Sequence, residues 1–287
     1  LTNIEIPESV TYIGEETFIE CSKLEAINVD ISNRNYISEN GILFDKEKTE
    51  IICYPSEKKD IKKYVIPETV TSIESSAFSE CSGLTNINIP GGVTNIGAFA
   101  FSGCSSLISI NIPEGVTTIA KYTFYECSSL ASINIPKSVM KIGYASFSGC
   151  SSLTSINIPE GVTSIGAFAF SRCSSLKNII IKDTVTEIGT EAFSECSSLK
   201  NIIIKDAVTE IGSEAIDKGT IIYTKSNTKA HKYAEENKQG YIIDDEAPTV
   251  ILTSNGNNNI QKAHNVKVLV TDNKEKVGVK NSSLKYQ

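Results

Sequence analysis

The chain repeats one 23-residue pattern of apolar and polar positions. A representative copy is LTSINIPEGVTSIGAFAFSRCSS, residues 153–175. Its first leucine recurs every 23 residues through six copies, at Leu84, Leu107, Leu130, Leu153, Leu176 and Leu199. Two further copies begin at Leu1 and Ile61, and residues 24–60 break the period between them. A period in the twenties predicts a solenoid, because one copy can bury its apolar residues only against neighbouring copies.

Each copy contains two short extended segments and one tighter segment. In the copy at residues 153–175, residues 156–158 alternate apolar, polar, apolar, which is the periodicity of a β-strand. Pro159 ends this strand, because proline has no N–H to donate to a ladder. Residues 162–166 predict a second extended segment, and residues 167–171 predict a helical or 3₁₀ turn. Stacked copies therefore predict a right-handed repeat solenoid with parallel β-strands.

Residues 24–60 form an irregular insert in this solenoid. The segments GILF and EIICYP lie on either side of the turn DKEKT, so residues 41–55 predict a β-hairpin. We expect the hairpin to be a structural insertion, and a binding role for its exposed edge is the alternative.

The last copy changes into a predicted cap at residues 216–243. Ile216 replaces the usual phenylalanine and Gly219 replaces the usual cysteine. The segment that follows predicts a strand, a helix with Asn227 as its N-cap, and a second strand. Such a cap closes the open end of a repeat stack, so the predicted solenoid domain spans residues 1–243.

The chain after the cap has a different composition. Residues 244–248, DDEAP, predict a linker, and a calcium site at this junction is the less favoured alternative. Within residues 249–287, TVILTS and NVKVLVTD alternate like β-strands around the turn-rich SNGNNN, which predicts a short all-β appendage.

Seven of the eight cysteines occupy one position of the repeat, and Cys53 lies elsewhere. The column comprises Cys21, Cys81, Cys104, Cys127, Cys150, Cys173 and Cys196. A residue that recurs once per coil is a packing position, where cysteine behaves as a small hydrophobe. Parallel side chains in a column have unsuitable Cβ directions for a disulfide, and zinc needs ligands that converge. We therefore expect free thiols in the core.

Composition and charge narrow the function classes. The 287 residues contain no apolar run long enough for a membrane span, so we expect no membrane insertion of this segment. The formal net charge is -7 and no basic stripe is present, which argues against a nucleic-acid partner. No signal peptide is visible, yet Leu1 already begins a copy, so we expect a fragment of a longer protein.

The frame L-x-x-I-x-I-P-x-x-V-x-x-I-G-x-x-A-F-x-x-C-x-x resembles the 23-residue leucine-rich repeat of the BspA type, in the class related to treponemal surface proteins. The resemblance covers residues 1 to about 243. It implies a leucine-rich-repeat solenoid in a surface-exposed or secreted protein, often of a host-associated microbe, with adhesion to host proteins described for some members. It does not imply an enzyme. Residues 249–287 weakly resemble the first strands of a bacterial immunoglobulin-like module.

Three sets of variable outward residues are candidate binding surfaces. The first lies between two inward isoleucines of each strand: Asn88, Asn111, Asn134 and Asn157. Stacked amides favour a structural ladder, with a ligand-binding strip as the alternative. The second is a basic and apolar contact patch nearer the C-terminus: Lys177, Ile180, Lys200 and Ile203. The third is Tyr122, Tyr125 and Tyr144 on the predicted turns, where packing between coils is favoured over an interface.

The sequence contains no arrangement typical of catalysis. Its two histidines, His231 and His264, lie outside the regular copies, and no glycine-rich phosphate loop is present. We therefore predict a protein without catalytic activity, cofactor or metal. The favoured hypothesis is a cell-surface or secreted module that presents an extended face to an extracellular protein of a host or another microbe. Glycan or cell-wall binding and a structural spacer are the alternatives, and the change of outward residues along the chain favours binding over a spacer.

Overall fold

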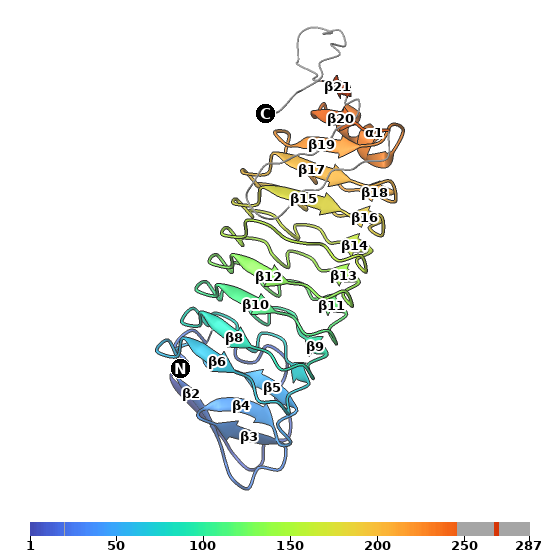
Figure 1. Cartoon of the computed structure of the whole chain (residues 1–287). Coiled ribbons are helices and arrows are strands. Elements are labelled where there is room, and N and C mark those ends of the chain that lie inside the picture. The colour runs from blue at the N-terminus through green and yellow to red at the C-terminus, as the bar shows by residue number, and fades with distance from the viewer. Residues whose placement is uncertain (20, 246–266, 270–287) are drawn as a thin grey trace.

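The computed structural model describes residues 1–19, 21–245 and 267–269, and these form a β-solenoid (Figure 1). The coils stack along one axis from the N-terminal end to helix α1 (Lys229–Glu236). Two rows of strands follow the rod, one from each extended segment of the repeat. The predicted repeat solenoid with parallel strands is thus confirmed.

The first row holds the longer strands: β1 (Asn3–Ile6), β2 (Ala26–Val29), β6 (Lys63–Val65), β8 (Asn86–Asn88), β10 (Ser109–Asn111), β12 (Ser132–Asn134), β15 (Asn178–Ile181), β17 (Asn201–Ile204), β19 (Ile221–Thr224) and β20 (Tyr241–Ile243). Paired strands in this row are parallel, and residues 23 apart lie side by side, as Ile110 and Ile133 do. The copy at residues 153–175 is an exception, because residues 153–159 form no strand. Its predicted alternation still holds, since Ile156 and Ile158 are buried and Asn157 is exposed.

The second row consists of two-residue strands: β7 (Ser72–Ile73), β9 (Asn95–Ile96), β11 (Thr118–Ile119), β13 (Lys141–Ile142), β14 (Ser164–Ile165), β16 (Glu187–Ile188) and β18 (Glu210–Ile211). Neighbours again pair in parallel, in the order β11-β13-β14-β16-β18. One isoleucine of each strand points inward, so this row closes the second side of the core.

The third side of each coil, the turn face, is built from turns and not from the predicted helical segments. Phe168 and Arg172 have left-handed backbone angles, with φ of 57° and 59°, and equivalent residues of other coils share them. A left-handed residue cannot continue a right-handed helix. The N–H of Phe168 donates instead to the carbonyl oxygen of Thr190 in the next coil, at 2.9 Å. The turn face is therefore a third ladder of hydrogen bonds between coils.

A column of stacked phenylalanine rings fills the core. Neighbouring ring centroids lie 5.2–5.5 Å apart, at interplanar angles of 3–19°. The fully buried members are Phe78, Phe101, Phe124, Phe147, Phe170 and Phe193. Each ring from Phe101 to Phe170 has an identical neighbour above and below, so removing one of these rings would leave a void that both neighbours line.

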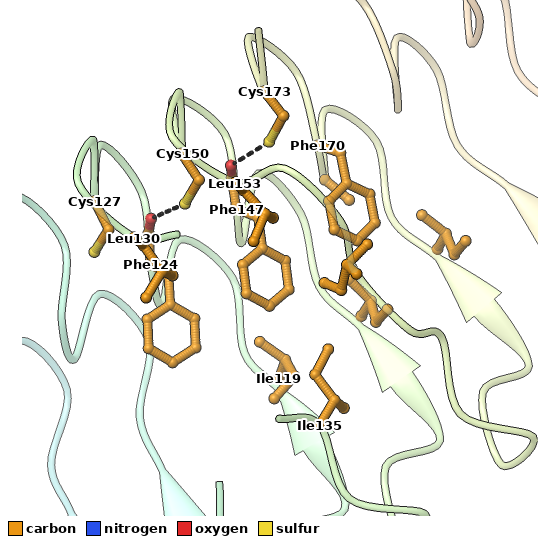
Figure 2. Packing of buried hydrophobic residues seen from close by; sticks show 14 of the residues in the cluster. Ile119, Phe124, Cys127, Leu130, Ile135, Phe147, Cys150, Leu153, Phe170 and Cys173 are labelled. Carbon is orange, nitrogen blue, oxygen red and sulfur yellow. Dashed lines mark hydrogen bonds between the residues drawn. The ribbon is translucent and has the colours of Figure 1, made fainter. Parts of the chain in front are cut away.

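Six members of the cysteine column are buried beside these rings, Cys21 in the first copy is half-buried, and the cysteines are free thiols, as predicted. The Sγ of Cys150 donates to the carbonyl oxygen of Phe124 in the preceding coil, at 3.2 Å (Figure 2). Cys173 makes the same bond to Phe147, at 3.2 Å. Burial raises the pKa of Cys196 in this column to about 12. The cysteines therefore act as hydrogen-bond donors between coils as well as hydrophobic side chains.

The insert adds three strands: β3 (Tyr36–Glu39), β4 (Ile42–Asp45) and β5 (Glu50–Cys53). β4 and β5 pair antiparallel, which confirms the predicted hairpin, and β3 also pairs antiparallel with β4. β5 then pairs in parallel with β7, and the ring of Tyr54 stacks on Phe78 at 5.3 Å. The insert thus returns to the solenoid as an enlarged coil.

The cap contains β19, α1 and β20, as predicted, but the N-cap of α1 is Thr228 and not Asn227. Thr228 has extended backbone angles and its side chain accepts the N–H of His231 at 3.1 Å, whereas Asn227 is left-handed with φ of 61°. An N-cap needs the extended conformation. Beyond the cap, β21 (Lys267–Leu269) pairs antiparallel with β20. The other residues of the predicted appendage, and residues 246–248 of the predicted linker, lie outside the described residues.

Candidate binding surfaces

The asparagines of the first candidate surface stand in one exposed row. Asn88, Asn111 and Asn134 end β8, β10 and β12, and Asn157 continues the row in the coil without a strand. Asn111 and Asn134 are register partners. Within the described part of the chain, however, no hydrogen bond joins the side-chain amides of this row. Strand pairing and the inward isoleucines, and not pairing between the amides, therefore align the row.

The residues of the second candidate surface are brought together by β15 and β17. Ile180 and Ile203 are register partners on the outward side, and both are half-buried. Lys177 and Lys200 are exposed in neighbouring coils, where the N–H of Lys200 donates to the carbonyl oxygen of Lys177 at 3.3 Å. Tyr223 of β19 extends this row as the register partner of Ile203. Sequence reasoning omitted Tyr223, although its outward position follows from the alternation of IIYT.

The tyrosines of the third candidate surface belong to a larger group on the turn face, which we call the aromatic cluster. It comprises Phe99, Tyr122, Tyr125, Tyr144 and Phe168, from four successive coils. Neighbouring ring centroids lie 4.5–5.5 Å apart. The ring of Tyr144 is 43% exposed, and the other four residues are half-buried. The packing expected for the tyrosines is present, but it occurs outside the core and leaves ring edges and hydroxyls at the surface.

Arg172, in the same coil as Phe168, reaches Tyr125 and Glu126 two coils away. Its guanidinium donates to the hydroxyl of Tyr125 at 3.2 Å and pairs with the carboxylate of Glu126 at 2.8 Å. The hydrogen bond to Tyr125, and after it the charge of Glu126, raise the pKa of Arg172. Burial, and after it the neighbouring Tyr144, raise the pKa of Tyr122. The cluster therefore carries a guanidinium that two partners hold in place.

The glycine between Glu126 and Arg172 makes their contact geometrically accessible. Gly149 occupies the equivalent position in the intervening coil, with φ of 78°, and a Cβ there would lie 2.8 Å from the Glu126 carboxylate. Because Gly149 has no side chain, Glu126 can reach across that coil to Arg172.

The sequence analysis did not identify Phe99, Phe168 and Arg172 as candidate residues. Both phenylalanines stand directly before an inward alanine, so an alignment of the copies at that position would have found them.

A hollow near the N-terminus is a weaker candidate. It has a volume of about 270 Å³ between the first copy and the insert, and Tyr12, Tyr36 and Glu50 are among its lining residues. Burial, followed by the charges of Glu74 and Asp45, raises the pKa of Glu50. Among the described residues, no group of three or more His, Cys, Asp or Glu side chains could hold a metal ion. No described helix is long and apolar enough to cross a membrane.

Comparison with known proteins identifies the repeat. The family model described as "BspA type Leucine rich repeat region" matches residues 1–65, 49–151 and 117–238. No curated protein that was compared with the chain matches it.

Solved structures of bacterial leucine-rich-repeat proteins are similar to the chain. A leucine-rich repeat protein from Eubacterium ventriosum is 31% identical over 76% of this chain and 59% of its own, with a TM-score of 0.67. A leucine rich cell surface protein from Faecalibacterium prausnitzii is 32% identical over 71% of this chain and 48% of its own, with a TM-score of 0.50. The pneumococcal vaccine antigen PcpA shares the fold at 24% identity over 86% of this chain and 56% of its own, with a TM-score of 0.60. The chain thus spans about half of the length of these structures.

Proposed function

Because the chain belongs to the BspA-type leucine-rich repeat family, we propose that it is a non-catalytic binding module of a cell-surface or secreted protein. Its partner is an extracellular protein of a host or of another microbe. The similarity to a leucine rich cell surface protein from Faecalibacterium prausnitzii supports the location.

One observation carries the binding role: the outer surface changes along a rod whose interior does not. The inward phenylalanines and cysteines recur in successive coils. Among the described residues, the aromatic rings that contact one another on the turn face lie in the four coils of residues 84–175. A spacer needs a regular interior and a soluble exterior, and it has no need for a local aromatic surface. Aromatic residues and arginine are enriched where proteins bind proteins.

The basic and apolar patch of Lys177, Ile180, Lys200 and Ile203 remains a second proposed contact surface. It lies on the side of the rod that the first row of strands forms, which we call the strand side. Its exposed lysines add positive charge there. The exposed row of Asn88, Asn111, Asn134 and Asn157 leads toward it along the same side. A partner that wraps around the rod would contact both the strand side and the turn face.

The proposal is tested by immobilising the full chain and measuring binding of purified extracellular-matrix proteins, serum proteins and a glycan array, with an unrelated repeat solenoid as control. Saturable binding of one protein class supports the proposal. Binding of glycans alone would replace it with glycan recognition, and no binding to any probe would favour the spacer. A variant with Lys177→Ser, Lys200→Ser, Ile180→Asn and Ile203→Asn that binds the partner unchanged would remove the strand-side patch from the site.

A further inference from the structure

We propose that the aromatic cluster, together with Arg172, is a binding site for a protein segment that has an apolar centre flanked by basic residues. This inference rests on the proposed binding function and assigns that function to particular residues. It commits the turn face, and not the strand side, to the main contact.

The fold does not require the rings of the cluster. Phe99, Tyr122 and Phe168 occupy one position of the repeat, and the other described copies place small or acidic residues there: Glu16, Ser76, Ala145, Glu191 and Glu214. Tyr125 replaces a serine that recurs in other copies, at Ser79, Ser102, Ser148, Ser171 and Ser194. These copies form the same coil without the rings. Folding of the coil therefore does not explain why these copies carry aromatic rings.

The backbone makes this position unfavourable for a bulky side chain. Phe99, Tyr122 and Phe168 have φ of 57–58°, in the left-handed region where the Cβ of an L-residue crowds the following carbonyl. Every copy adopts this conformation, so the coil itself imposes it. Backbone conformations that a side chain tolerates poorly are concentrated at functional sites. Three aromatic residues at such a position in four coils point to a role at the surface.

The polar groups of the site are held in place before any partner arrives. Arg172 is fixed by Tyr125 and Glu126, and its guanidinium also lies 5.8 Å from the Tyr125 ring centroid. The side chain of Arg172 is still 43% exposed. Because the rotamer of Arg172 is already restricted, this side chain loses less conformational entropy when a partner binds than a free arginine would.

The ring orientations favour a protein over a glycan. Phe99 stacks on Tyr122 at an interplanar angle of 13°, and the ammonium of Lys121 lies 5.8 Å from the Phe99 ring centroid. Tyr125 and Tyr144 are tilted by 81° and 62° from Tyr122. The rings cover one another's faces and form no common flat surface on which sugar rings could stack. Their edges and hydroxyls instead suit the mixed apolar and polar side chains of a protein.

Charge on either side of the cluster selects the partner. Toward the N-terminus the turn face carries Glu74 and Glu80, and toward the C-terminus it carries Glu191, Glu195 and Glu214. At about 4.8 Å per coil, the four coils of the cluster cover roughly 15–20 Å, the length of about five or six extended residues. A complementary segment therefore has five or six largely apolar residues with lysine or arginine on both sides.

The chain supplies its own replacements for testing this site. We define the repeat-matched variant as Tyr122→Ala, Tyr125→Ser, Tyr144→Ala, Phe168→Ala and Arg172→Gly, each taken from an equivalent position of another copy. Since those copies fold, the variant should keep the circular-dichroism spectrum and melting behaviour of the parent. The control variant, Asn86→Ser with Ala131→Thr, changes two exposed residues on the strand side of the same coils that belong to none of the candidate surfaces. Each replacement is taken from an equivalent position, Ser109 and Thr154.

The experiment pans a displayed library of random 12-residue peptides on the full chain and measures the affinity of the enriched peptides for both variants. We expect enriched peptides to carry lysine or arginine around an apolar centre. Their affinity should fall at least about tenfold for the repeat-matched variant, as for loss of an interface hot spot, and stay unchanged for the control. Glu80→Gln with Glu195→Gln should weaken binding severalfold and flatten its salt dependence.

The assignment would be overturned if the enriched peptides bound the repeat-matched variant as tightly as the parent. It would also be overturned if the enriched peptides were acidic or neutral, or if no peptide were enriched. Glycan binding that the repeat-matched variant abolishes would also overturn it. These outcomes differ from failure of the proposed function. If a purified extracellular protein binds the parent and the repeat-matched variant equally, the module binds proteins but uses another surface.

Discussion

Two sets of aromatic rings stack along the same four coils, one inside the solenoid and one outside. The inner rings, among them Phe124 and Phe147, are fully buried and nearly coplanar with their neighbours, at 3–19°. The outer rings of the aromatic cluster meet at angles from 13° to 81° and remain partly exposed. The inner rings recur in each regular copy, whereas the outer ones do not.

This difference separates two requirements on one sequence. A residue that faces the core meets the same environment in each coil, so one residue type suits every copy. A residue that faces solvent meets no such constraint, and its identity can differ from coil to coil. Regularity therefore identifies what the solenoid needs in order to fold, and departure from regularity identifies what the surface does.

The largest expected effect comes from comparing one ring of each set. Phe147→Ala should lower the free energy of unfolding by about 3–5 kcal/mol, because it leaves a cavity between two stacked rings. Tyr122→Ala, which removes an outer ring of the preceding coil, should cost less than about 1 kcal/mol, since its position accepts alanine elsewhere. Urea unfolding followed by circular dichroism measures both. Equal losses would show that the outer rings are part of the folding core.

A smaller effect is expected from adding one methyl group where coils touch. A Cβ at Gly166 would lie 2.8 Å from the carbonyl carbon of Gly143, so Gly166→Ala should cost about 1–3 kcal/mol through overpacking. Gly91→Ala is the matched control, because a Cβ there meets nothing within 4 Å. Thermal melting of the two variants should differ by several degrees. Identical melting temperatures would contradict the close packing of the turn face.

The cysteine column should contribute less per residue. Cys150→Ala removes the donor to the Phe124 carbonyl oxygen and should cost about 1–2 kcal/mol. Cys150→Ser keeps a donor at the same position and should separate the bond from the packing of the sulfur. If the alanine variant were as stable as the parent, the thiol would act as a space-filling group alone.

The buried thiols also predict an alkaline loss of stability. Burial raises the pKa of Cys196 from 9.0 to about 12, so above pH 9 the unfolded chain loses this proton while the folded chain keeps it. Stability from this group is complete below pH 9 and declines as the pH rises toward 12. Melting temperatures between pH 8 and pH 11 should therefore fall less steeply for Cys196→Ala than for the parent. Parallel curves would show that the thiol does not contribute.

The repeat predicted much of the fold, but it did not predict the local backbone geometry. The 23-residue period predicted the parallel register and the buried cysteines, and the turn DKEKT between two apolar segments predicted the hairpin of the insert. The helical turns were wrong, because the pattern of residues 167–171 does not reveal that Phe168 and Arg172 are left-handed. Strand β3 was not predicted, because apolar and polar residues alternate only weakly in YISE. Its pairing with β4 is what makes it a strand.

Which residues face the core follows from the 23-residue period, because it places identical side chains above one another, where their burial stabilises each coil. The same period marks Tyr122, Tyr125 and Tyr144 as departures from the pattern. That these tyrosines contact Phe99, Phe168 and Arg172 depends instead on how the coils stack. Those contacts join residues that are up to 47 positions apart, as Arg172 and Tyr125 are. The neighbouring pair of Arg172 and Glu126 meets across a gap that Gly149 leaves open. The spacing of turns in three dimensions, and not the order of residues, brings such groups within reach of one another.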